Sequence, residues 1–260
     1  MDKREARFEK FMNVLDSQKY LSISEMAKVL GVSNMTVRRD FEVLNQRKFV
    51  VIKNGILMLN TEQDAAPVRK VYNLDKETQI QNTVKNSIGR FAASLISPKD
   101  CIIIDTGSTT NTILPHLPAD MHITLLCYNL NILLQAQQNP NISLSFAGGH
   151  YHPSSQMFES PESISFIQNT RANKVFISAA GIHEHLGLTC INPYEVSTKQ
   201  AILRSAAERI LVADSSKFSK VHASYFCSLD EIDTLICNKG LDEEWLEILK
   251  NHEITVHLVE

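Results

Sequence analysis

Two short stretches hold residues whose types and spacing could do chemistry. The first is GVSNMTVRRD, residues 31–40, where Arg38 and Arg39 stand side by side in a chain with a formal net charge of −3. A guanidinium fork can pair with guanine edges or with phosphate oxygens. The second is DTGSTT, residues 105–110, where a glycine and several hydroxyl residues can turn N–H and O–H donors toward an anion. The two stretches predict a nucleic-acid contact and a phosphate site.

Each stretch also has a plainer interpretation. Paired arginines on a helix are often only solvated surface, and a hydroxyl cluster can simply cap a helix. The distribution of charge favours the first stretch as a nucleic-acid contact. Residues 1–60 carry 11 Lys and Arg against 7 Asp and Glu, whereas the remainder carries 15 against 22. A basic head on an acidic body predicts that only the head meets a polyanion.

The elements that position the arginines form a predicted helix-turn-helix. Apolar residues at helical spacing predict one helix around residues 8–15 and a second around residues 23–30. Ser22 and Glu25 have the spacing of a capping box, so the second helix should begin there and end at Gly31.

Ser33 suits the N-cap of a third helix, with apolar residues at 37, 41 and 44 on its inner face. The outer face then carries Met35, Arg39, Glu42 and Gln46, flanked by Thr36 and Arg38. After it, FVVIKNGILML contains two β-prone runs around Asn54-Gly55, which predicts a hairpin. A hairpin in this place is a wing, so the head is predicted to be a winged helix-turn-helix, mainly α.

The run LSISEMAKVLGVSNMTVRRDFEVLNQRKFVVIKNG resembles the N-terminal domain of the DeoR family of bacterial transcriptional regulators. The resemblance implies that double-stranded operator DNA is contacted by Ser33, Thr36, Arg38 and Arg39, with Asn34 and Met35 beside them. Lys53 is the single charge in the predicted wing, where the family often has more basic or histidine residues. We therefore expect a small contribution of the wing to affinity.

The rest of the chain reads as a linker and an α/β domain. We expect a DNA-binding domain over residues 1–60, a linker over 61–75 and an effector-binding and oligomerisation domain over 76–260. The spacing of apolar residues predicts a helix from about residue 80 to 95. Short apolar runs then alternate mostly with helix-length segments, which predicts a mainly parallel sheet covered on both faces; they are CIIID, ITLLC, ISLSF, KVFIS, ILVAD, DTLIC and ITVHLV.

Ligands of such sheets bind beyond the carboxyl ends of the strands, so the polar residues there are candidates. Asp105-Thr106-Gly107-Ser108-Thr109-Thr110 follows the first strand, directly before a predicted helix. The stretch lacks the lysine of a GxxxxGK[ST] loop, so a nucleoside triphosphatase is not indicated. Asp214 and Lys217 follow ILVA, and Lys199 lies in the helix predicted after Glu195; either lysine could supply the positive charge that the first loop lacks.

The second part of the chain resembles the effector domain of the DeoR family, which is related in fold to ribose-5-phosphate isomerase. The matching sequence blocks, in family order, are IIIDTGSTT, CYNLN, AGG, SAAGI, the neighbourhood of Glu195 to Lys199, and ADSSKF. SAAGIHEHLGLTCIN and LCYNLN most resemble the branch that regulates deoxyribonucleoside operons. The resemblance implies a repressor of a carbohydrate or nucleoside operon, released by a phosphorylated sugar, with a pentose phosphate favoured. The residues it implies for the effector are Asp105, Gly107, Ser108, Thr109, Thr110, Asn129 and Lys217, with Gly181 and Lys199 as lesser candidates.

Three alternatives remain open. The body could be a sugar-phosphate isomerase, but the related isomerases carry a DGADE-like acidic segment where this chain reads SAAGI, so no catalytic residue is assigned. A metal could use the pairs His150/His152 and His183/His185, yet these fall in predicted loops without other ligands, so no metal and no cofactor are expected. The third alternative is an architectural DNA binder whose body takes no ligand.

Length and composition set the remaining expectations. A chain of 260 residues suits two domains, and five scattered cysteines suggest neither a disulfide framework nor a zinc pair. The charged start and the lack of a long apolar run predict neither a signal peptide nor a membrane span, so we expect a cytoplasmic protein. Because one head reads few base pairs, at least a homodimer is expected.

Overall fold

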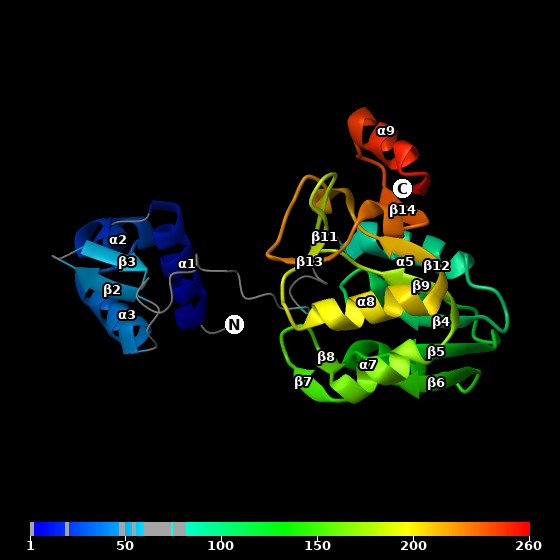
Figure 1. The fold of residues 1–260 in the computed structure, drawn as a ribbon. Coiled ribbons are helices and arrows are strands. Elements are labelled where there is room, and N and C mark those ends of the chain that lie inside the picture. Colours follow the sequence, from blue (N-terminus) through cyan, green and yellow to red (C-terminus); the bar gives the residue numbers. More distant parts are fainter. Residues whose placement is uncertain (1–2, 19–20, 47–49, 54–55, 60–73, 75–81) are drawn as a thin grey trace. The chain divides into compact units, whose positions relative to one another are not determined.

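The computed structural model describes residues 3–18, 21–46, 50–53, 56–59, 74 and 82–260. The chain divides into two compact units, Met1–Lys70 and Val71–Glu260 (Figure 1). Of the predicted linker 61–75, Leu74 alone lies within the described residues.

The first unit contains the three predicted helices: α1 (Lys3–Gln18), α2 (Ile23–Leu30) and α3 (Asn34–Gln46). Ser22 and Glu25 form the predicted capping box at the start of α2. Gly31 ends α2 at φ +68°, a left-handed conformation that glycine adopts without strain, and its N–H donates to carbonyl groups of the last turn. The predicted helix-turn-helix is therefore confirmed, including the capping box at Ser22 and the helix end at Gly31.

A small sheet completes the first unit. Strands β1 (Leu21–Ser22), β3 (Ile56–Leu59) and β2 (Val50–Lys53) lie in that order, and β2 pairs antiparallel with β3. The two predicted wing strands are thus present, whereas the predicted turn residues Asn54 and Gly55 lie outside the described residues. The core of this unit draws on every helix and on the sheet; its buried members are Phe8, Phe11, Leu15, Leu21, Met26, Ala27, Val37, Leu44, Val50 and Leu57.

The second unit is built on a parallel sheet whose order, over the described residues, is β15-β14-β12-β9-β4-β5-β6. Its strands are the seven that the sequence predicted: β4 (Cys101–Ile104), β5 (Ile123–Cys127), β6 (Ile142–Phe146), β9 (Ala172–Ile177), β12 (Ala206–Val212), β14 (Thr234–Asn238) and β15 (Thr255–Val259). The helices are α5 (Asn82–Ser94), α6 (Leu130–Ala136), α7 (Pro161–Gln168), α8 (Glu195–Ser205) and α9 (Glu243–Asn251).

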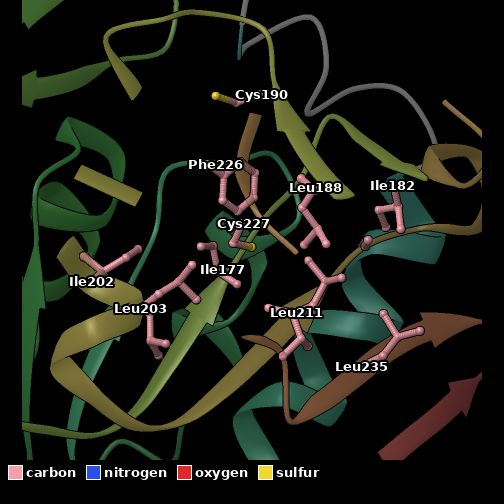
Figure 2. Close-up of a cluster of buried hydrophobic side chains, with 14 of the residues drawn as sticks. Ile177, Ile182, Leu188, Cys190, Ile202, Leu203, Leu211, Phe226, Cys227 and Leu235 are labelled. Atoms are coloured by element: carbon pink, nitrogen blue, oxygen red, sulfur yellow. The ribbon is translucent and has the colours of Figure 1, made fainter. Parts of the chain in front are cut away.

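Successive strand residues point to opposite faces, so the sheet has two apolar cores. On one face, Ile102 and Ile104 pack with side chains of α5 and α6. On the other face, Ile103 belongs to the core shared with α7, α8 and α9. Figure 2 shows part of this second core, where Ile177 of β9 and Leu211 of β12 lie among side chains of α8 and of a smaller sheet. Helices cover both faces, as the continuous apolar strands predicted (Figure 1).

Two features differ from the sequence-based expectation. The helix predicted after Thr110 is a pair of 3-10 turns, η1 (Thr110–Thr112) and η2 (Leu114–His116), because Pro115 and Pro118 interrupt an α-helix in this segment. The loop 105–110 therefore has no α-helix dipole behind it. Two further 3-10 turns, η3 (Ser215–Lys217) and η4 (Leu229–Glu231), follow later strands.

The second difference concerns the histidine pairs. His150–His152 form β7, which pairs antiparallel with β8 (Met157–Glu159). His183 ends β10 (Gly181–His183), which belongs to a small sheet with β11 (Gly187–Cys190) and β13 (Ser224–Cys227). The prediction of loops was wrong for His150, His152 and His183, because strands of three residues are too short to show a period, whereas His185 lies in the turn between β10 and β11.

Over the described residues, no helix has the length and apolarity that crossing a bilayer requires. All five cysteines are free thiols, and four of them are buried.

Candidate functional site

Helix α3 presents the predicted DNA-binding residues to solvent. Asn34, Arg38 and Arg39 are exposed, as is Met35, with 59% of its surface accessible. Within the described part of the chain, Arg38 and Arg39 make no hydrogen bond or ion pair. Both guanidinium forks are thus available to an outside partner.

The first turn of α3 is capped by its own hydroxyls. The Ser33 Oγ accepts the Thr36 N–H at 3.2 Å and lies 2.9 Å from the Thr36 Oγ1. Ser33 is exposed, and Thr36 is half-buried. Lys53, the remaining DNA-binding candidate, ends β2, and its side chain is not among those described.

A third arginine, which sequence reasoning missed, holds α3 from behind. The Asp40 carboxylate is 1% exposed and accepts Arg7 Nε at 2.5 Å and Arg7 Nη2 at 3.0 Å. The bidentate pair joins α1 to the inner face of α3. Its signal in the sequence was Asp40, which stands three residues after Val37 on the face predicted to be apolar.

In the second unit, polar residues gather at the carboxyl ends of neighbouring strands. Asp105 follows β4, Tyr128 follows β5, Ser178 follows β9 and Asp214 follows β12. These strands are adjacent in the order β12-β9-β4-β5 and run in parallel, so their carboxyl ends meet at one edge of the sheet.

At the centre of this edge, Asp105 and Lys199 pair with each other. The Asp105 Oδ2 accepts the Lys199 Nζ at 2.5 Å, and it also accepts the Ser178 N–H and Oγ, each at 2.9 Å. The Tyr128 hydroxyl donates to the other oxygen, Oδ1. Asp105 is fully buried and Lys199 is 2% exposed. The structure therefore brings these two predicted effector ligands together, and each satisfies the other.

The charges around this pair are coupled. Burial alone would lower the pKa of Lys199, but the carboxylates of Asp105 and Glu195 outweigh it, and the pKa is raised. Burial and the Asp105 charge raise the pKa of Tyr128 well above its ordinary value. Burial also raises the pKa of Glu195, against the opposing effects of Lys199 and of a hydrogen bond from Asn192.

Next to this cluster, loop 107–110 offers backbone donors. The N–H groups of Gly107, Ser108, Thr109 and Thr110 donate no hydrogen bond to another described residue. The side chains of Ser108 and Thr109 also make none within this part of the chain, whereas the Thr110 Oγ1 donates to the Gly107 carbonyl. A run of free N–H groups is the arrangement that receives an anion.

Gly107 is required by packing. A Cβ at this position would lie 2.7 Å from the Ser178 Oγ and 2.8 Å from the Ser178 Cβ. The Ser178 Oγ also lies 2.7 Å from the Thr106 carbonyl oxygen. Ser178 thus supports both the ion pair and the loop. The SAAGI block signalled its place in the sequence, although its role could not be predicted.

Asn129 lies beyond β5, the strand next to β4. Its Oδ1 accepts the Ile132 N–H at 2.8 Å and so caps α6. The residue is fully buried, and its Nδ2 has no hydrogen-bond partner in the described structure. A buried amide donor without a partner is costly, which makes Asn129 a candidate to donate to a ligand.

The remaining candidates divide by role. The Asp214 Oδ1 accepts the Ser216 N–H and caps η3, which ends at the half-exposed Lys217. Because one strand lies between β12 and β4, the loop of Lys217 begins about 10 Å from loop 107–110. Gly181 has a different explanation, since a Cβ there would lie 2.5 Å from the Lys220 carbonyl oxygen.

The histidine pairs make other contacts. His150 and His152 share a face of β7, with ring centroids 4.8 Å apart. His152 stacks on Tyr194 and lies 3.3 Å from a carboxylate oxygen of Glu159. No group of three or more metal-ligating side chains occurs among the residues that the structure describes.

Comparisons with known proteins identify two domains. Residues 7–62 match the sequence model described as the DeoR-like helix-turn-helix domain, and residues 80–239 match the DeoR C terminal sensor domain. The chain is 28% identical to the Deoxyribose operon repressor of Escherichia coli (strain K12) over 252 residues, which cover 97% of each protein. It is also 28% identical to the HTH-type transcriptional regulator IolR of Bacillus subtilis (strain 168), over 96% of this chain and 99% of that protein.

Among solved structures, the chain is similar to ribose 5 phosphate isomerase A from Neisseria gonorrhoeae, with a TM-score of 0.38 and 14% identity. The aligned part covers 54% of this chain and about half, 55%, of the isomerase chain. The two matched domains, in contrast, span most of the sequence and include both candidate sites. The chain belongs to the DeoR family of transcriptional regulators, with a helix-turn-helix DNA-binding domain and a sensor domain.

Proposed function

We propose that this regulator represses a carbohydrate or nucleoside catabolic operon and leaves its operator when a phosphorylated sugar binds the second unit. The observation that carries the proposal is the run of N–H groups in loop 107–110 that donate to no other described residue, at the edge of the sheet where such folds bind ligands. The similarity to a protein named a deoxyribose operon repressor supports repression and favours a pentose phosphate.

The phosphate would lie on loop 107–110, where four backbone N–H groups and the hydroxyls of Ser108 and Thr109 can donate to it. Asn129 Nδ2 would donate from the neighbouring strand end. Lys217 would reach the anion from the β12 side, because a span of about 10 Å suits a lysine side chain and a small sugar phosphate. Asp105 and Lys199 would shape the site rather than touch the ligand.

Operator DNA would be contacted by α3. Arg38 and Arg39 would supply base or phosphate contacts, with Ser33, Asn34, Met35 and Thr36 beside them and Lys53 from the wing. We assign residues 1–60 to this contact, 61–75 to the linker and 76–260 to effector binding and oligomerisation. A protein of this kind acts in the cytoplasm, as at least a dimer on repeated half-sites.

An enzymatic role is disfavoured by the carboxylates. Isomerisation needs an accessible general base, and Asp105 is fully buried with four donors on its two oxygens. Asp214 is 1% exposed and caps η3. We propose that the body binds its sugar phosphate without converting it. Steady interconversion of ribose 5-phosphate by the purified chain would contradict this.

The proposal is tested by operator release with the full-length chain. A duplex enriched from a random library by the protein is labelled, and its dissociation is followed by anisotropy as ribose 5-phosphate or 2-deoxyribose 5-phosphate is added. We expect release by at least one sugar phosphate. Lys217→Ala should need more effector while keeping the affinity of the ligand-free protein for DNA.

Lys220→Ala, a change of an exposed lysine three residues away, is the matched control and should respond like the wild type. If no phosphorylated sugar releases the DNA or raises the melting temperature, the architectural DNA binder becomes the better account. If Lys217→Ala loses DNA binding without effector, the residue is structural.

A further inference from the structure

One turn of the second unit is bonded directly to the candidate effector site. Residues 153–156 join β7 to β8, and the Ser155 carbonyl oxygen accepts the Thr106 Oγ1 at 2.8 Å. The next carbonyl of the turn, that of Gln156, accepts the Leu130 N–H at 2.8 Å. Thr106 directly precedes the donor loop 107–110, and Leu130 directly follows Asn129. A movement of loop 107–110 or of Asn129 would therefore also move the turn.

The same turn holds the start of the second unit. The Ser154 carbonyl oxygen accepts the Leu74 N–H at 3.0 Å, and Leu74 is fully buried. The boundary between the units lies between Lys70 and Val71, so Leu74 is the fourth residue of the second unit. The turn thus holds the first described residue of the second unit.

Tyr194 fixes the turn in place. Its hydroxyl lies 3.1 Å from the Ser154 Oγ and 3.0 Å from the Ser155 Oγ. Its ring is stacked on His152, with centroids 3.6 Å apart and planes within 6°. Gln156 has φ +53°, a strained value for a residue with a side chain, which such contacts must maintain. A strained turn held by a few hydrogen bonds suits an element with two arrangements.

We propose that turn 153–156 couples loop 107–110 to Leu74, and that release of operator DNA by the effector depends on this coupling. The inference rests on the proposed function and specifies its regulation. An anion that draws the free N–H groups of the loop together displaces Thr106, and with it the carbonyl groups that hold Leu74. Thr106 and Tyr194 are positioning residues, because they act through the turn and not on the ligand. The effector can shift operator affinity only by its differential affinity for the two arrangements.

The test separates effector binding from operator release in the full-length chain. Thr106→Val removes the hydroxyl that bonds to Ser155 and keeps the side-chain shape. Tyr194→Phe removes the hydroxyl that holds the turn and keeps the ring on His152. Matched controls are Thr170→Val, which removes a hydroxyl bonded to a carbonyl at the end of α7, and Tyr225→Phe, which changes an exposed tyrosine on β13.

Three quantities are measured with ribose 5-phosphate and 2-deoxyribose 5-phosphate: effector affinity by calorimetry, and operator affinity without and with saturating effector. We expect both turn variants to keep the first two quantities near wild type. The factor by which effector weakens DNA binding should fall by about 2- to 30-fold, the range expected for residues that carry coupling between two sites. Deuterium exchange at the Leu74 peptide should be faster in the two variants than in the controls.

Unchanged release factors in both turn variants, with a wild type that responds, would overturn the role of the turn and leave the proposed function intact. A loss of effector affinity equal to the loss of release would also overturn it, because the residues would then belong to the binding site. A wild type that neither binds nor responds to any phosphorylated sugar overturns the proposed function, and the role of the turn in release is overturned with it.

Discussion

Removing the charge of Lys199 should destabilise the second unit severely. In Lys199→Met the apolar stem is retained, but the Asp105 carboxylate stays fully buried without its cation. Breaking one side of a buried ion pair costs about 3–5 kcal/mol. For a unit of this size each kcal/mol lowers the melting temperature by about 2–4 °C, so the expected loss is roughly 6–20 °C. Because the pKa of Lys199 is raised, its contribution is present below the ordinary lysine pKa and is lost only as pH rises through the raised value.

The chain provides its own reporter for this measurement. Its single tryptophan, Trp245, belongs to α9 and is 6% exposed in the core of the second unit, so its fluorescence follows the unfolding of this unit in urea. Lys239→Met is the matched control, since the pair of Lys239 with Glu260 is largely exposed and its loss should leave the midpoint unchanged.

A second variant separates charge from packing. Asp105→Asn combined with Lys199→Met leaves no charge in the pair, so the double variant should be more stable than Lys199→Met alone. The reasoning is refuted if the free energy of unfolding of Lys199→Met lies within about 1 kcal/mol of the wild-type value between pH 6 and 9. It is also refuted if the double variant is less stable than the single one.

Three further outcomes follow from the geometry. Arg39→Ala should cost about 1–3 kcal/mol of operator binding and flatten the preference at one base pair if the fork reads a guanine, whereas an equal loss on all duplexes would identify a phosphate contact. Glu195→Gln keeps an acceptor for Asn192 and removes a charge whose pKa burial has raised. The penalty of that charge appears as pH rises above the ordinary glutamate pKa of 4.5, so the variant should gain stability relative to wild type as pH rises from there; a constant difference in urea midpoints would contradict this. Gly107→Ala forces its new methyl group against Ser178, so it should cost about 1–3 kcal/mol and weaken effector binding in calorimetry; an unchanged affinity would mean that the loop does not hold the ligand.

Much of the fold was predictable because its signals are local. The capping box at Ser22, the glycine at position 31 and the period of apolar residues determine the helices of the first unit within a few residues. The seven apolar runs of the second unit became the seven strands of its sheet, since a strand buried on both faces must be apolar throughout. Where the local signal was short, prediction failed: β7 and β10 have three residues each, and two prolines turned an expected α-helix into 3-10 turns.

The location of the candidate site could be predicted from the sequence, but the contacts that its residues make could not. A polar residue at a strand end is identified by its position alone, so Asp105 was found; Lys199, 94 residues later, was found as a cation near the same edge. Sequence spacing carries no information on whether two such groups face a ligand or each other. The tertiary fold decides this, by burying both side chains and leaving room for Ser178 between them and the loop. Free backbone donors cannot be predicted at all from residue types, because every residue except proline has an N–H group. Two parts of the site could therefore not be predicted from the sequence: the neutralised pair Asp105–Lys199, and the N–H groups of loop 107–110 that have no partner among the described residues. The two are related, because the pair, through Ser178, fixes the loop. A fixed loop with unsatisfied donors can select an anion.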